Sequence, residues 1–139
     1  MTWGRHLLNR LFDALGAISA LAYSSGEMGD VATTTVEVRF TQNVNATDYT
    51  AGVTIKVNSV SQTINSGTRQ SDHRFVFYVI NTAADVNDVI TWEYDDDLGD
   101  YVDDESNPMG DIGASSVTNY IGSHLYFDTA DDAVWIAAA

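Results

Sequence analysis

A run of carboxylates in the second half of the chain is the part of the sequence best suited to chemistry. Eight Asp and Glu residues fall between Asp95 and Asp111. Calcium takes about six to eight oxygen ligands from carboxylates, carbonyls and water. The candidate ligands are Asp95, Asp97, Asp100 and Asp103. The alternative is a solvated acidic loop. The spacing is not that of an EF-hand calcium loop, because Asp100 stands at the position of the EF-hand glycine when Asp95 is counted as position one.

The distribution of charge narrows the classes of partner. The formal net charge is −14, and residues 75–139 hold fourteen acids and neither Lys nor Arg, whereas six acids and six bases cancel in residues 1–74. Binding of nucleic acid needs clustered Lys and Arg side chains, so we do not expect DNA or RNA as a partner. The chain has no cysteine, which excludes disulfides and thiolate metal sites.

The residue types of enzyme active sites do not occur here in a catalytic pattern. The sequence lacks a G-x-S-x-G elbow, an H-E-x-x-H pair and a Gly-rich loop with a lysine. Ser71, Asp72 and His73 are adjacent, but neighbours on a strand point to opposite faces and cannot form a triad. We therefore expect a non-enzymatic protein without catalytic residues and with no cofactor other than the candidate calcium.

The first 22 residues have the 3.6-residue period of an amphipathic helix. We expect a helix from Trp3 to Ala22, within a helical arm of residues 1–28. The face that we expect to bind a protein partner comprises Trp3, Leu7, Leu11, Phe12, Leu15 and Ile18. Packing of this helix on its own domain and a targeting role are the alternatives. No stretch reaches the roughly 20 apolar residues of a membrane span.

From Val31 onward the period changes from 3.6 to 2, as in half-buried strands. The segments around Val36, Ile55 and Ile90 alternate apolar and polar residues, and Phe75–Ile80 is apolar throughout, as in a strand covered on both sides. Short strands separated by polar turns are typical of a β-sandwich. The core is expected to centre on Phe40, Ile55, Phe75, Phe77, Ile90 and Trp92.

Several of these strands resemble, in order, those of a bacterial immunoglobulin-like repeat. The matching pieces are Val36–Phe40 with Val44, Val53–Asn58, Ile90–Tyr94, Asp103 or Asp104 with Asn107, and Val117–Asn119. Ser106 stands where that family has a glycine before the asparagine. The resemblance implies an antiparallel immunoglobulin-like sandwich over residues 29–122.

The last 17 residues, 123–139, are expected to add a C-terminal β-hairpin. Leu125–Phe127 and Val134–Ile136 flank a polar loop, and this segment is similar to the first hairpin of laminin-G-like jelly rolls. Tailed phages carry immunoglobulin-like modules on their particles.

The function implied by these resemblances is that of a virion surface protein, in the first instance a capsid decoration or cement protein. Its partner would be the major capsid protein or another virion protein, and it would be homo-oligomeric or bound in the assembly. The alternative is a secreted or tail-borne adhesin at the cell surface. Such an adhesin would bind glycans through exposed aromatic residues near the acidic loop, such as Tyr94 or Tyr101.

Overall fold

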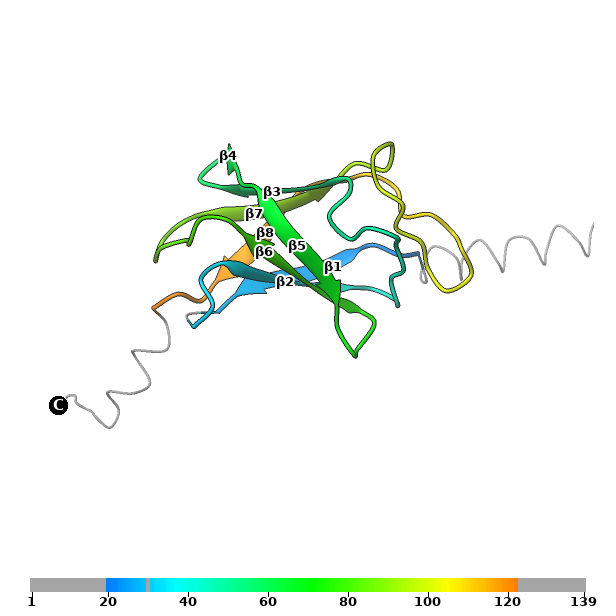
Figure 1. The fold of residues 1–139 in the computed structure, drawn as a ribbon, viewed down its shortest axis with the longest axis horizontal. Helices are drawn as coiled ribbons and strands as arrows, with labels where there is room; N and C mark the ends of the chain where they lie inside the picture. The colour runs from blue at the N-terminus through cyan, green and yellow to red at the C-terminus, as the bar shows by residue number, and fades with distance from the viewer. Residues whose placement is uncertain (1–19, 30, 123–139) are drawn as a thin grey trace, which may run out of the picture.

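The described part of the protein is a single curled β-sheet. The computed structural model describes residues 20–29 and 31–122. The eight strands follow the order β4-β3-β7-β8-β1-β2-β6-β5 across the sheet (Figure 1). Their bounds are β1 Tyr23–Met28, β2 Thr35–Phe40, β3 Val53–Val57, β4 Val60–Ser61, β5 Ile64–Arg69, β6 Phe75–Ile80, β7 Ile90–Tyr94 and β8 Ile112–Asn119. The predicted all-β character of this region is confirmed, and no helix occurs within it.

The first strand lies where the sequence favoured the end of the helical arm. Residues 23–28 pair antiparallel with β2 and parallel with β8. The expectation of a purely antiparallel sheet is therefore wrong at one pair, and the sheet is mixed. Tyr23 explains why the polar sequence of β1 is stable as a strand: its ring stacks on Trp92 with centroids 5.3 Å apart, and its hydroxyl donates to the carbonyl of Ser116 at 2.6 Å.

The core lies on the concave side of the curled sheet and is built around one tryptophan. Trp92 of β7 is fully buried and contacts Phe40 of β2 edge-on, with ring centroids 5.7 Å apart. The predicted core positions Phe40, Ile55, Ile90 and Trp92 are confirmed as buried. A fully buried tryptophan or phenylalanine contributes about 3–5 kcal/mol to stability when judged by its truncation to alanine.

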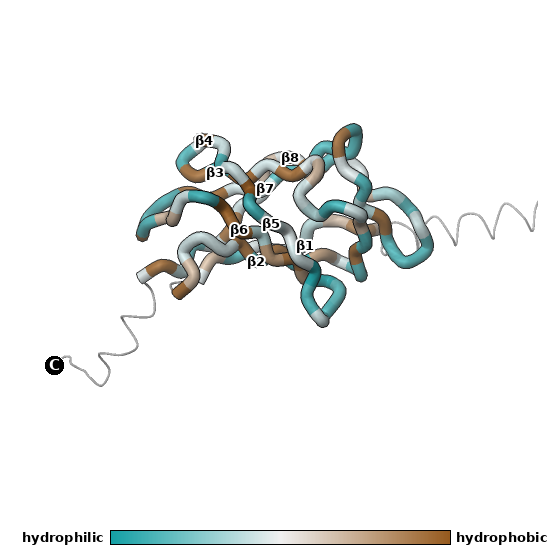
Figure 2. The backbone as a smooth tube through the Cα atoms, viewed as in Figure 1, coloured by the Kyte–Doolittle hydropathy of each residue, from teal (hydrophilic) through white to brown (hydrophobic). Residues whose placement is uncertain are grey.

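The predicted inward face of β6 is wrong. Val76, Tyr78 and Ile80 are buried, whereas Phe75 and Phe77 are only half-buried and point to the opposite side. An all-apolar strand carries no period-2 signal, so the sequence could not show which set of side chains faces inward. As a result the outer side of β6 displays an apolar row. Figure 2 shows the apolar sequence of this strand as a brown stretch along β6.

The chain enters and leaves the sheet at opposite ends. At the entry pole, the hydroxyl of Thr41 donates to the carbonyl of Ala20 at 2.7 Å. At the exit pole, the side-chain amide of Asn119 donates to the carbonyl of Asp85 at 2.9 Å. The long 95–111 loop lies at the entry pole (Figure 1). Almost all of the predicted helix and all of the predicted C-terminal hairpin lie outside the described residues. Within the described range no helix is long and apolar enough to cross a membrane.

Candidate functional site

The acidic loop starts where β7 ends and is held against the segment that leads into β3. The amide of Asp95 donates to the carbonyl of Gly52 at 2.9 Å, and Gly52 has a φ of +78°. A Cβ atom on Gly52 would lie 2.6 Å from the carbonyl oxygen of Asp95 and 2.8 Å from the amide nitrogen of Gly99. Glycine is required at this position by both its φ and its surroundings, and the two chain segments are therefore in direct backbone contact.

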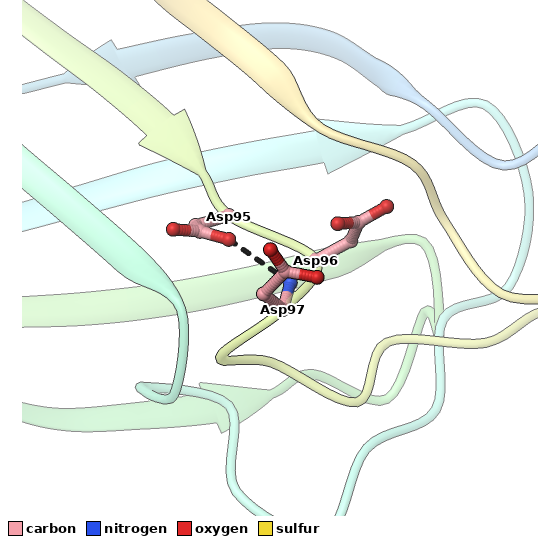
Figure 3. Close-up of side chains that lie close together, drawn as sticks. All are labelled: Asp95, Asp96 and Asp97. Carbon is pink, nitrogen blue, oxygen red and sulfur yellow. Dashed lines mark hydrogen bonds between the residues drawn. The ribbon is translucent and has the colours of Figure 1, made fainter.

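Three consecutive carboxylates lie together at the start of this loop. Asp95, Asp96 and Asp97 are exposed, and one oxygen of each lies within 4.8 Å of the others (Figure 3). Asp95 Oδ1 accepts a hydrogen bond from the amide of Asp97 at 2.9 Å, which folds the three residues into a turn. Of the four predicted calcium ligands, this cluster contains Asp95 and Asp97. It also contains Asp96, which the sequence analysis did not select.

Asp96 is hydrogen-bonded to a carboxylate from farther along the chain. Its amide donates to Asp111 Oδ1 at 2.8 Å. The hydrogen bond between its carboxyl group and that of Asp111 raises the pKa of Asp96, and the neighbouring acids add to this effect. The proximity of like charges thus opposes ionisation of Asp96.

Asp100 does not belong to the carboxylate cluster, because its side chain binds a neighbouring segment. Its Oδ2 accepts hydrogen bonds from both the amide of Thr47, at 3.0 Å, and the Thr47 hydroxyl. These bonds hold the pKa of Asp100 below its usual value. The carboxylate therefore ties the acidic loop to the 41–50 segment.

Asp103 is buried and organises a tight turn. Its Oδ1 accepts from the amides of Glu105 and Asn107, at 2.9 and 2.8 Å, and its Oδ2 accepts from the side-chain amide of Asn107 at 3.0 Å. Burial on its own would raise the pKa of Asp103, but the bonds from Asn107 and Glu105 outweigh it and lower the pKa. This carboxylate has the role of a structural acceptor within the turn.

The turn around Asp103 places one residue in the left-handed region of backbone conformation. Ser106 has a φ of +68°, in the left-handed region that glycine adopts without steric cost. Ser106 is thus a serine in a conformation that favours glycine.

A polar network joins the acidic loop to β5. Asp104 accepts from the side-chain amides of Asn43, at 2.9 Å, and Asn45, at 3.0 Å. Asn45 in turn accepts from the Arg69 guanidinium at 2.6 Å. The bonds from Asn45 and Asn43 lower the pKa of Asp104. The Arg69 guanidinium is therefore engaged in an internal hydrogen bond.

The tyrosines below the acidic loop are buried. Tyr94 and Tyr101 are 3% and 1% exposed, which excludes them as the exposed aromatic platform expected for glycan binding. The Tyr101 amide donates to the Tyr94 hydroxyl at 3.0 Å, and the Tyr101 hydroxyl donates to the carbonyl of Tyr49. Sequence reasoning placed these rings near the acidic residues correctly but gave no sign that the loop folds over them.

A hollow of about 270 Å³ remains beside the carboxylate cluster. It is lined in part by Asp96, Asp97 and Asp100, with Tyr94 and Met109 below. The space could hold a hydrated cation, but each of its carboxylates is exposed or already bound to protein donors. The geometry thus favours the solvated acidic loop over a dedicated metal site.

The remaining predicted site residues differ in how far they are described. The six arm residues Trp3, Leu7, Leu11, Phe12, Leu15 and Ile18 lie outside the described residues. Asp72, which neighbours Ser71 and His73, uses its carboxylate to accept the amide of Arg74 at 3.1 Å in the turn before β6. No known protein-family model matches the sequence, and no curated protein sequence matches it significantly.

Proposed function

We propose that the protein is a non-enzymatic structural component of a virion surface, in the first instance a phage capsid decoration or cement protein. The observation that carries the proposal is that the chain's candidate chemical groups serve its own architecture. Asp100 and Asp103 accept hydrogen bonds from Thr47 and Asn107. The acidic loop is thus a braced, strongly charged surface, which suits a protein that must stay soluble while it is displayed at high density.

The proposed domain is an immunoglobulin-like sandwich formed by two halves of the curled sheet, and the strand order supports it. One half would be β5-β6-β2-β1 and the other β8-β7-β3-β4. The contact of Trp92 with Phe40, and that with Tyr78 at a centroid distance of 6.2 Å, join residues of the two halves. The two halves meet where β1 pairs with β8, so the sheet would bend between these two strands.

The proposed mode of attachment is through the N-terminal arm, to a neighbouring protein of the virion. The support is the apolar periodicity of residues 3–18 together with the position of Ala20 at the entry pole, away from the exit pole. A module held at one end presents its other end to the surroundings. The partner would be the major capsid protein or another copy of this chain.

Two measurements test this function. Mass spectrometry and immunogold labelling of purified virions should find the protein on the particle surface in many copies. A full-length L11D variant should not reassociate with particles, whereas N9D, on the other face of the predicted helix, should bind normally. Absence of the protein from particles would overturn the proposal. Specific binding to a glycan array would also overturn it, because it would favour the adhesin.

A further inference from the structure

The outer side of β6 is an apolar row, and among the described residues the Arg39 guanidinium lies over one end of it, at the Phe75 ring. Phe75, Phe77 and Val79 alternate with the buried residues of this strand and are half-buried. The neighbours on the β5 side are short: Ser66 pairs with Val79, and Thr68 pairs with Phe77. Short polar neighbours leave the row accessible from outside, as expected for a strand that is covered on both sides in its working state.

Two acids lie directly beside this row on the neighbouring strands. Glu27 of β1 and Glu37 of β2 are register partners, and Glu37 is in turn the partner of Phe77. Like charges directly opposite each other on neighbouring strands are destabilising. Burial raises the pKa of Glu37, and the charge of Glu27 raises it further. Arg39, the nearest base on β2, lies instead over the Phe75 ring, 5.8 Å from its centroid.

The first 19 residues have the complementary pattern. Their predicted apolar face contains Leu7, Leu11 and Leu15, and Arg5, Arg10 and Asp13 lie outside this face. A helix from residue 3 to residue 18 would be about 24 Å long at 1.5 Å per residue. The six residues of β6 span about 20 Å. Length, apolar character and charge of this segment all match the outer surface formed by β1, β2 and β6.

Residues 20–22 run outward from the end of β2 at the entry pole. Thr41 donates its amide to the carbonyl of Ala22 and its hydroxyl to the carbonyl of Ala20, so residues 20–22 continue the line of β1 beyond the end of β2. Docking on its own β6 would require a reversal near residues 17–20, Ala-Ile-Ser-Ala, where Ser19 is the one residue of a type common in turns. A neighbouring copy is reached without such a reversal.

We propose that the outer surface of β1, β2 and β6 is the docking site for residues 3–18 of a second copy, with the apolar face of the segment on Phe77 and Val79 and its arginines beside Glu27 and Glu37. This inference deepens the proposed function by naming the partner of the arm as another copy of this chain. Each copy would offer one arm and one docking surface, so that the contact can propagate from copy to copy.

Photo-crosslinking of the full-length chain tests the contact directly. A photoreactive phenylalanine analogue replaces Phe77 in a protein mixed from light and heavy isotope-labelled copies. We expect crosslinks from position 77 to residues 3–18 that join light to heavy chains. The same analogue at Val60, exposed on β4, is the matched control and should give no such crosslink. Crosslinks confined to one chain, or none to residues 3–18, would overturn the proposal.

Charge reversal is the second arm of the test, because it depends on complementarity rather than on burial. E27K at an exposed position, and R10E separately, should each weaken self-association by about tenfold in sedimentation velocity, since like charges across an interface oppose association. The E27K protein mixed with the R10E protein should recover most of the loss. Normal self-association of both variants, or no recovery in the mixture, would contradict the proposal. The virion assay above is read independently, since a decoration protein can bind the capsid without binding itself.

Discussion

The hydroxyl oxygens of Tyr78 and Tyr101 lie 2.5 Å apart inside the curled sheet. Tyr78 comes from the middle of β6 and Tyr101 from the acidic loop, so this hydrogen bond attaches the loop to the core. Burial raises the pKa of both hydroxyl groups, and for Tyr101 the proximity of Tyr78 raises it further.

The tyrosine pair predicts a specific sensitivity to substitution. Y101F should lower the free energy of unfolding by about 1–3 kcal/mol, because it removes the buried bond to Tyr78 and leaves the part-buried carbonyl of Tyr49 without this donor. T118V, which removes an exposed hydroxyl group on β8, is the control and should change stability little. Urea titration followed by tryptophan fluorescence measures both. Equal stability of Y101F and wild type would contradict the role of the pair.

The raised tyrosine pKa values also set the alkaline limit of the fold. Unfolded tyrosine ionises near pH 10, whereas the buried hydroxyl groups keep their protons to higher pH. Below about pH 10 the native and unfolded chains bind these protons equally and stability is independent of pH; above it the unfolded chain loses them first, and stability falls as pH rises. Circular dichroism and absorbance at 295 nm should therefore show unfolding together with tyrosine ionisation. Ionisation of all tyrosines with an intact far-ultraviolet spectrum would contradict this expectation.

Gly52 predicts where the acidic loop is most easily detached. G52A should destabilise the protein by about 2 kcal/mol or more, because the added methyl meets the backbone of Asp95 and Gly99 at a φ that disfavours alanine. G110A is the matched control, since no atom lies within 4 Å of a Cβ at that position. Differential scanning calorimetry compares the two. A melting temperature of G52A equal to that of G110A would show that the loop adapts freely.

Ser106 offers a stabilising change. Since its φ is +68°, S106G should raise the free energy of unfolding by up to about 1 kcal/mol, as relief of the left-handed strain exceeds the entropy lost by glycine. S106A should give no such gain, because alanine retains the strain. Thermal melts of the two variants separate this effect from loss of the serine hydroxyl, and a higher melting temperature for S106A than for S106G would refute the explanation.

The acidic loop predicts a response to salt but no specific response to calcium. Added salt screens repulsion between exposed carboxylates over about 8–10 Å and should raise the melting temperature. Calcium at millimolar concentration should do no more than sodium chloride or magnesium chloride of equal ionic strength. A bound calcium ion would add about 2.7 kcal/mol at a hundredfold excess over its dissociation constant. A calcium-specific shift that D95N and D97N abolish would establish the site.

The strands with alternating sequence were predictable, and the segments that depend on tertiary contacts were not. In β7, the pattern of Ile90, Trp92 and Tyr94 against Thr91 and Glu93 predicted the buried face correctly. In β1 the sequence has no such pattern. A Cβ on its Gly26 would lie 2.6 Å from the Tyr23 hydroxyl oxygen. Glycine is unfavourable within strands in general, but here Gly26 leaves the space in which the Tyr23 ring lies flat on the sheet.

The candidate site shows the same division. The sequence indicated an acidic loop after β7, and the structure has one. It could not indicate which carboxylates are engaged, because the donors that bind Asp100 and Asp104, namely Thr47, Asn43 and Asn45, lie more than 50 residues away along the chain. The spacing of acids alone therefore grouped Asp100 and Asp103 with Asp95 and Asp97, whereas the folded chain separates their roles.

The parallel pairing of β1 with β8 determines how the domain carries mechanical tension. Since the chain enters ahead of β1 at one pole and leaves after β8 at the other, a force on the two ends pulls these strands past each other along their length. The bonds that cross between them, from the Tyr23 hydroxyl to the carbonyl of Ser116 and from the amide of Tyr120 to the carbonyl of Met28, are then loaded together in shear rather than opened one after another. If both ends of the domain were tethered, the pairing of β1 with β8 would bear the pulling force before any other strand pair of the sheet.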